Sequence, residues 1–436
     1  MLPQSNLLIM ARIARGREEH LRALLATMNQ RPGFADPENP LLPFGRFGRL
    51  HVARFVILED PTPDDLSVYG LPTRSFAPTL AFMADCDGSA DELLAQLVAL
   101  CEAGLRSIFS HCDGFSASND LLDWMRQHRA RPAAAYVNWV GRTVRQIREE
   151  AALYGAVSAY LDTNDTNGRA LGIETPQRIR RQLMDFVEAE KRAGRVVLNP
   201  SEPTPVGWRI RNLLNLIAIP LVLLMASPLL ILYLPAFLWL LRRKETRDPE
   251  VLPRPQPGHR SVIAALEDND VTNPYIVLGY LKPGWFRLST VIFLLWIVDY
   301  GARHIYNRGH LGRVQTIHFA RWVFLNDRRQ MFFASNYDGS LDSYMDDFIN
   351  KVAWGLNLLF SNGVGYPRTD WLLVGGASDE QKFKYYLFRH QLPVQVWYKA
   401  YPGLTSFDLM RNSRLREGIE RSSMTDYEIR EWLNLL

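Results

Sequence analysis

The chain of 436 residues is long enough for two or three domains, each able to bury a hydrophobic core of its own. Its net charge of +4 is small, which argues against a dedicated nucleic-acid-binding protein, because such proteins concentrate basic charge on one face. Cys86, Cys101 and Cys112 form no C-x-x-C pair, which argues against a disulfide framework and indicates a reducing compartment. The opening MLPQSNLLIMARIARG does not have the pattern of a secretory signal.

Apolar, β-branched and aromatic runs predict four strands in the first third of the chain, with a long helix before the last of them. The helix is predicted at Ser89–Phe109, where Ser89 and Glu92 resemble a capping box. A charged helix is expected at Thr175–Ala193, followed by the proline-containing link Asn199–Pro205. The strands are predicted at Asn6–Ile13, His51–Leu58, Leu80–Ala84 and Ala134–Trp139.

The longest apolar run extends from Asn212 to Leu241 and contains no charged residue. It is longer than the roughly 20 residues that one membrane-spanning helix needs. Basic residues flank both of its ends, and such flanks mark the cytoplasmic side of a membrane. We therefore expect a membrane hairpin bent near Ser227 and Pro228. A pair of buried helices in a soluble core is the alternative.

Similar elements follow this run. Arg247–Pro257 is predicted to be a Pro-rich linker. The second apolar run, Leu288–Val298, is too short to span a membrane, and it is either a core helix or a helix at the membrane surface. Strands are predicted at Pro274–Tyr280, His318–Leu325, Met331–Ala334 and Val394–Tyr398, with a helix at Leu341–Phe360.

The two sides of the long apolar run resemble each other in three blocks that keep their order. LHVARFVILED, from Leu50, resembles IHFARWVFLND, from Ile317, and an Asp-Gly-Ser sequence follows each. The third block begins at Ala117 and again at Ala377. The offsets are 267 for the His-Arg pairs, 251 for the Asp-Gly pairs and 260 for the Ala-Ser pairs. We infer that one module was duplicated.

Each copy has the element order β-α-β-β-α-β with an extra helix before the last strand, which is the ferredoxin-like arrangement. We therefore expect an α+β protein: two tandem ferredoxin-like modules that form a pseudo-dimeric α/β barrel, with a membrane hairpin inserted between them. Two halves of one barrel must lie on the same side of a membrane. The predicted parts are module 1 at 1–165, a helix and linker at 166–208, the hairpin at 209–244, a Pro-rich linker at 245–271 and module 2 at 272–436.

Two polar patterns recur in both copies. His51 and Arg54 recur as His318 and Arg321, in the pattern H-x-A-R-aromatic. A charge on either face of a barrel strand is costly unless it is paired. These side chains therefore either line an internal pocket, or each arginine pairs with a carboxylate of its own module. Asp338, in the repeated Asp-Gly-Ser, either stabilises a turn before a capped helix or lies in a pocket near Arg321.

Two such modules in one chain resemble the tandem form of the dimeric α/β-barrel superfamily, which includes dye-decolourising peroxidases and chlorite-dismutase-like haem proteins. The resemblance is one of element order. It implies a haem peroxidase-like oxidoreductase, in which a G-x-x-D-G motif places an aspartate over the haem beside an arginine. Here Ala84 and Ser335 stand where that motif has its first glycine.

The resemblance implies Arg321, Asp338 and His318 as catalytic residues. A haem would also need an axial ligand, usually histidine. The candidates are His304, His310, His318 and His390, each of which is otherwise a polar surface or core histidine. No G-x-S-x-G elbow, phosphate-binding loop, H-E-x-x-H or paired C-x-x-C is present in the sequence.

Two functions follow from these patterns. The first is a membrane-associated oxidoreductase, peroxidase-like, that acts on an apolar or lipidic small molecule in the barrel. The second is a non-catalytic, membrane-bound protein that uses the barrel to bind a lipid or a partner. Both place the protein on the cytoplasmic face of a membrane, which is the inner membrane in a bacterium, and neither involves nucleic acid.

Overall fold

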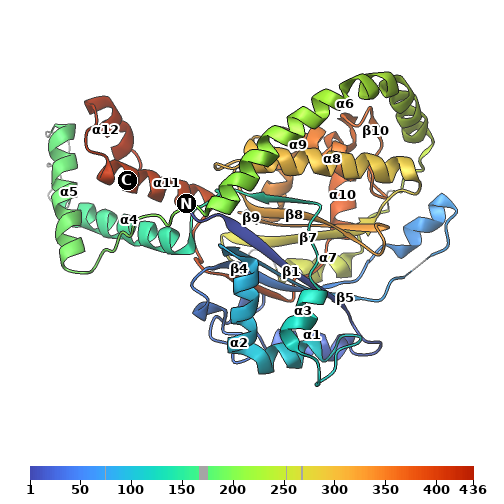
Figure 1. Ribbon diagram of the computed structural model, residues 1–436, viewed down its shortest axis with the longest axis horizontal. Helices are drawn as coiled ribbons and strands as arrows, with labels where there is room; N and C mark the ends of the chain where they lie inside the picture. The colour runs from blue at the N-terminus through green and yellow to red at the C-terminus, as the bar shows by residue number, and fades with distance from the viewer. Residues whose placement is uncertain (74, 166–174, 252, 267–268) are drawn as a thin grey trace.

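The computed structural model describes residues 1–73, 75–165, 175–251, 253–266 and 269–436. Two four-stranded sheets lie in its centre, and helices cover the outer face of each (Figure 1). An arm of helices projects from one side of this body, and both chain ends lie on that side. The fold class is therefore α+β, as predicted. Parts of the two predicted linkers, at 166–174, 252 and 267–268, lie outside the described residues.

Each sheet contains three strands of one module and the last strand of the other. The first sheet has the order β1-β5-β4-β12 and the second has the order β6-β8-β9-β7, with all neighbours antiparallel. Thus β6 of module 1 pairs with β8, and β12 of module 2 pairs with β4. The strands are β1 (Gln4–Arg12), β4 (Leu50–Leu58), β5 (Thr79–Asp87), β6 (Ala134–Val137), β7 (Thr272–Tyr280), β8 (Ile317–Leu325), β9 (Gln330–Asp338) and β12 (Val396–Lys399).

The chain just before each exchanged strand joins the edges of the two sheets. The Met10 amide in β1 donates to the carbonyl of His128 (2.9 Å), which precedes β6. The Leu392 amide, which precedes β12, donates to the carbonyl of Ile276 in β7 (2.9 Å). Each chain segment therefore contacts the first strand of its own module and then crosses to the other sheet. This exchange differs from two self-contained ferredoxin-like modules, in which each last strand would remain in its own sheet.

Side chains alternate along the strands between the two faces of each sheet. One set, which includes Val56, Met83, Phe319 and Phe332, forms an apolar cluster between the sheets. The other set packs against helices: α1, α2 and α3 on the first sheet, and α8, α9 and α10 on the second. Their bounds are α1 (Glu18–Ala26), α2 (Ala90–Phe109), α3 (Leu121–Gln127), α8 (Trp285–His304), α9 (Leu341–Phe360) and α10 (Glu380–His390).

The long helices α2 and α9 match each other in detail. Ser89 and Ser340 cap them through side-chain oxygens that accept backbone amide hydrogens of the first turn. Each helix departs from helical backbone angles once inside, at Cys101 and at Val352, 251 residues apart. This is the offset of the Asp-Gly pairs in the sequence. Both predicted helices are confirmed, and the shared irregularity supports the duplication.

The projecting arm consists of the helices that follow the exchanged strands and the helices that pack on them (Figure 1). Its own apolar cluster includes Leu153, Leu183, Leu415 and Trp432. The charged helix predicted at Thr175–Ala193 is confirmed as α5, which belongs to this arm. The arm helices are α4 (Val144–Asp165), α5 (Pro176–Arg192), α11 (Ser406–Glu420) and α12 (Asp426–Leu433).

The long apolar run forms one helix, α6 (Val206–Arg247), and not the predicted pair of helices joined at Ser227 and Pro228. Pro220, Pro228 and Pro235 lie inside it. A proline removes one backbone donor and bends a helix without ending it when the flanking residues stay helical. Figure 1 shows α6 curving over α8. The correction is therefore from a hairpin to one bowed helix.

Contacts at both ends explain the bow. Near its start, Asn212 Oδ1 accepts a hydrogen bond from Arg303 Nε at the end of α8 (2.8 Å). Near its end, Leu241 packs with Phe286 at the start of α8. If both helices were straight, the helical rise would place Asn212 and Leu241 of α6 roughly 44 Å apart. Their partners in α8, Arg303 and Phe286, would be only roughly 26 Å apart. Helix α6 must therefore arch away from α8 in its middle.

The far end of α6 is fixed by a buried carboxylate. Glu245 accepts hydrogen bonds from the Thr369 hydroxyl (2.9 Å) and from the amides of Trp371 and Leu372 (2.8 Å each). Both ends of α6 therefore rest on module 2.

The remaining elements are β2 (Asn29–Arg31), β3 (Phe34–Ala35), η1 (Phe44–Arg46), η2 (Pro63–Tyr69), α7 (Pro257–Ala264), β10 (Thr369–Asp370), β11 (Val374–Gly375) and η3 (Gly376–Ser378).

Candidate functional site

The repeated histidines and aspartates form two matched, buried pairs. His51 Nε2 lies 2.8 Å from Asp87 Oδ1, and His318 Nε2 lies 2.6 Å from Asp338 Oδ1. The second oxygen of each carboxylate accepts a hydrogen bond from the first backbone amide of a helix that follows an exchanged strand. Asp87 Oδ2 accepts it from α4 (2.9 Å), and Asp338 Oδ2 accepts it from α11 (2.6 Å). These two His-Asp pairs therefore fix the arm helices to the sheets.

Both histidines line one small cavity at the end of the sheets. His51 Nδ1 also lies 3.1 Å from the Tyr401 hydroxyl. The cavity, of about 30 Å³, has the size of a single water molecule. Ligand sites for organic molecules are roughly ten times larger. The structure thus brings the predicted His318 and Asp338 together, but beside no cavity that would accept an organic substrate.

Arg321 lies elsewhere and does not pair with Asp338. It points between the sheets and donates to Asp85 Oδ2 of module 1. Its register neighbour on β9 is Ala334, four residues before Asp338. The expectation that Arg321 and Asp338 share a pocket is therefore wrong, as is the alternative of a carboxylate from the same module.

The two arginines have unequal surroundings because the repeat differs at one position. The residue that corresponds to Asp85 in module 2, at the offset of 251, is Asn336, and its buried side-chain amide has no hydrogen-bond partner. Arg54 Nη1 donates instead to the carbonyl of Ser335 (2.8 Å). Burial and the neighbouring charge of Arg321 lower the pKa of Arg54 to about 9.

Besides His318, the histidines predicted as haem ligands lie in three separate places. His304, in α8, lies 2.8 Å from Asn215 Oδ1 in α6. His310 is exposed in the loop before β8, and His390 is buried at the end of α10 beside a cavity of only about 10 Å³. A haem needs a cavity of several hundred Å³ on the open side of its ligand. The arrangement of these residues does not favour haem.

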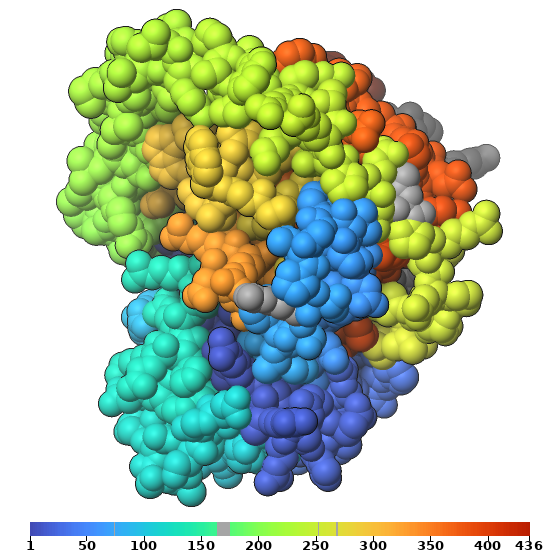
Figure 2. Space-filling model, turned by 90° about the vertical axis from the view of Figure 1, so that its right-hand side faces the viewer, coloured from blue at the N-terminus to red at the C-terminus, as the bar shows by residue number. Residues whose placement is uncertain are grey.

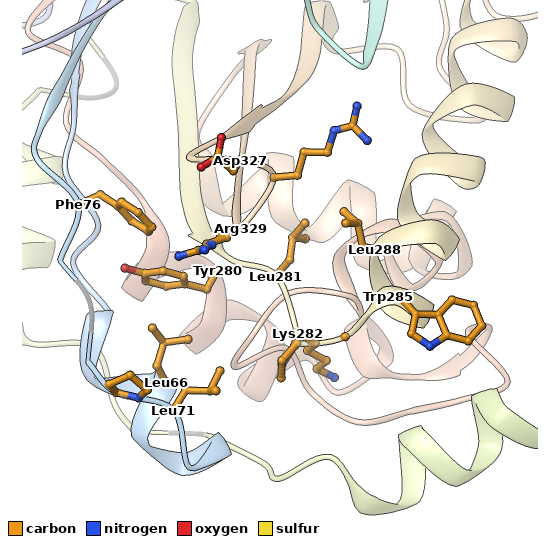
Figure 3. A pocket seen from close by; sticks show the side chains of 14 residues that line it. Leu66, Leu71, Phe76, Tyr280, Leu281, Lys282, Trp285, Leu288, Asp327 and Arg329 are labelled. Atoms are coloured by element: carbon orange, nitrogen blue, oxygen red, sulfur yellow. The ribbon is translucent and has the colours of Figure 1, made fainter.

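A cavity of about 500 Å³ lies at the other end of the sheets, where three segments meet. Most of its lining is apolar. Figure 3 shows Phe76 and Tyr280 on one side and Trp285 on the other, with Lys282 between Leu71 and Trp285 in this view. The segments are the β4–β5 connection (Leu66, Leu71, Pro72, Phe76), the chain from β7 into α8 (Tyr280–Trp285, Leu288) and the β8–β9 turn (Asp327, Arg328, Arg329).

The β8–β9 turn carries backbone strain at the rim of this cavity. Asn326, Asp327 and Arg328 have φ values of 48°, 55° and 61°. Non-glycine residues adopt this left-handed region at a cost, which is lowest for Asn and Asp. The Asn326 side chain supports the turn by donating to Gln330 Oε1 (2.7 Å). Strain of this kind is concentrated at functional positions, and here it fixes Arg328 and Arg329 beside the opening.

Two buried cations below the cavity share a single carboxylate oxygen. Asp248 Oδ2 lies 2.5 Å from Arg287 Nη2 and 3.4 Å from Lys282 Nζ. Arg287 is only 1% exposed, and its Nε and Nη1 have no hydrogen-bond partner. Burial, together with the Arg287 charge, lowers the pKa of Lys282 to about 8. Asp248 caps the end of α6, so these charges connect the cavity with the bowed helix.

Sequence reasoning missed this cavity, although the offsets contained a signal. The offset falls from 267 at the His-Arg pairs to 251 at the Asp-Gly pairs, so module 1 has 16 more residues between β4 and β5. Those residues include η2 and form one wall of the cavity. Figure 2 shows this segment, in bright blue, lying against the orange β8–β9 turn and the golden α8. The cavity therefore lies where the two copies differ most.

No family model, curated protein or solved structure matches this chain.

The Asp338 pair predicts a pH-dependent stability. Burial by itself would raise the pKa of this carboxyl, but the His318 charge and three hydrogen bonds outweigh burial and lower it. A lowered carboxyl pKa stabilises the fold above the ordinary value of about 4, and this stabilisation is lost below it. Asp338→Asn should lower the melting temperature at pH 7, and its difference from the wild type should shrink as the pH falls below about 4. A difference that stays constant to pH 3 would contradict this role.

The unequal arginine partners predict unequal effects of replacement. Arg321→Leu leaves the buried Asp85 carboxylate without its ion pair and should lower the free energy of unfolding by about 3–5 kcal/mol. Arg54→Leu removes a charge whose hydrogen bond is to a backbone carbonyl, and the loss should be about 1–2 kcal/mol. Adding Asp85→Leu to Arg321→Leu should restore much of the stability. Denaturant unfolding of the three variants is the measurement, and equal losses for the two arginines would rule out this asymmetry.

Proposed function

We propose that this is a membrane-bound, non-catalytic protein that holds the apolar part of a lipid in the 500 Å³ cavity beside α8. The observation that supports it most is the position of that cavity, between a largely apolar wall and the first turn of a helix with exposed aromatic side chains. Its volume lies within the range of roughly 300–1,000 Å³ that is typical of ligand sites.

The membrane attachment rests on the surface of α6. Helix α6 is long and apolar enough to cross a membrane, and only 6% of its apolar stretch is buried. Helix α8 is also long enough, which corrects the expectation from Leu288–Val298, but 33% of its apolar stretch is buried. A soluble protein rarely exposes so large a continuous apolar surface. Among the exposed side chains are Leu224, Met225, Leu229, Ile231, Leu232 and Trp239.

The bow supports a topology in which both modules lie on one side of that membrane. Because both ends of α6 return to module 2, the helix enters the bilayer from one face and leaves through the same face. Basic residues flank both ends of the apolar stretch and support the proposal that this face is the cytoplasmic one: Arg209 and Arg211, and Arg242, Arg243 and Lys244.

The cavity then lies at the level of the membrane interface. Trp285 lines it and is 69% exposed, and tryptophan is enriched where a protein crosses from the head groups into the hydrocarbon. Among the described residues that line the cavity there is no histidine, cysteine or serine to act as a nucleophile or a haem ligand. Binding is therefore favoured over peroxidase-like chemistry, and the two pseudo-dimeric halves serve as its scaffold.

The membrane attachment is tested by placing charged residues in the middle of α6. Leu224→Asp combined with Leu232→Asp places two carboxylates where hydrocarbon is expected, at a cost of several kcal/mol. In a liposome flotation assay, the wild type should float with the vesicles and this variant should remain in the dense fraction. The matched control, Phe407→Asp with Tyr427→Asp, removes two exposed aromatic residues of the arm and should float as the wild type does. Flotation of the Leu224 and Leu232 variant would reject the attachment.

The lipid site is tested by filling it. Leu71 is 37% exposed and lines the cavity, so Leu71→Trp should occupy cavity volume without disturbing the core. Binding of a fluorescent, uncharged monoacylglycerol should weaken by about tenfold or more, equivalent to about 1.4 kcal/mol. Leu100→Trp, at an exposed position of α2, provides the control. If Leu71→Trp and Leu100→Trp bind the probe equally well, the cavity does not hold the acyl chain.

A further inference from the structure

We propose that the cavity is selective for an anionic phospholipid, whose phosphate group is held by Lys282 and the first backbone amides of α8. This inference rests on the proposed lipid site and adds the chemistry of the head group. It is carried by side chains that the apolar lining does not explain.

The first support is the buried Lys282 at the wall of the cavity. Arg287, which does not line the cavity, pairs with Asp248 Oδ2 at 2.5 Å. The same oxygen lies 3.4 Å from Lys282 Nζ, and Glu245 is a second carboxylate whose charge acts on Lys282. A buried ammonium is stable only when acceptors lie close to it. An anion in the cavity, which Lys282 lines, would supply a closer acceptor.

The second support is the start of α8, which has no cap. Gly284 occupies the N-cap position with a φ of 105°, no side chain caps the helix, and its first turn contains no acidic residue. The first amides of a helix carry a partial positive charge and bind phosphate oxygens. Gly284 and Trp285 line the cavity, so this helix end and Lys282 lie on the same wall.

The third support is the rim. Arg328 and Arg329 are exposed in the strained turn opposite α8, where Asp327 is the acidic neighbour. Basic residues at an opening attract anions from the surrounding membrane surface. Apolar walls, a buried pair of cations and a basic rim together match an amphiphile with a negatively charged head, and a phosphate offers more acceptor oxygens to several donors than a carboxylate does.

The experiment is a titration of the full-length protein, in uncharged detergent, with three soluble probes. Dihexanoyl phosphatidic acid has both parts of the ligand, dihexanoyl glycerol lacks the phosphate, and inorganic phosphate lacks the chains. Isothermal calorimetry should show the phosphatidic acid binding at least tenfold more tightly than either of the others. Its affinity should fall as the pH rises through about 8, because Lys282 then loses its proton.

Lys282→Gln should remove the preference for the phosphatidic acid over the glyceride, and Lys282→Arg should retain it. Arg243→Gln, at an exposed position near the end of α6, should leave it unchanged. Equal binding of the phosphatidic acid and the glyceride by the wild type would overturn the head-group site while leaving the lipid site intact. Inorganic phosphate that binds as tightly as the phosphatidic acid would overturn the assignment to a lipid. If neither lipid binds, the proposed function itself fails.

Discussion

The exchange of the last strands between the two sheets constrains everything else in this structure. Because β6 completes the sheet of module 2 and β12 completes the sheet of module 1, neither module can be separated from the other without breaking a sheet. The segment that joins them must leave and return to the same body. Helix α6 contacts module 2 at both of its ends, so it bows between them, and the prolines inside it permit the bend.

The cavity follows from asymmetry within this pseudo-symmetric frame. The His-Asp pairs, the serine caps and the helix irregularities are the same in both copies, as expected of features that serve the fold. The long β4–β5 connection occurs in module 1, whereas the apolar α8 and the tight β8–β9 turn occur in module 2. Their meeting point has two buried cations, Lys282 and Arg287, that share Asp248, and it has the strained turn. The candidate site therefore lies where the two similar halves differ most.

The strands and helices could largely be predicted from the sequence, because each has a strong period or cap: β4 and β8 were predicted within a residue of their ends. The partners of these elements could not be predicted. The local hydrophobic pattern does not indicate which sheet β6 joins. The packing of the two sheets determines that Arg321 pairs with Asp85 and not with a residue of its own module. The bow of α6 depends on contacts that its residues Asn212 and Leu241 make with α8, which is distant in the sequence. The only sign of the cavity in the sequence is the change in the repeat offset from 267 to 251, and this change does not indicate the chemistry of the cavity.

The measurement that tests this account most directly is the depth profile of α6 in a lipid bilayer. Nitroxide labels on single cysteines at Leu213, Leu224, Leu232 and Trp239, all exposed positions, report depth through collisions with oxygen and with a water-soluble nickel complex. The account predicts the greatest depth at 224 and 232 and shallow positions at 213 and 239. It also predicts that a membrane-impermeant reagent on one side reduces the labels at both ends. Labels at 213 and 239 that are reduced from opposite sides would contradict it.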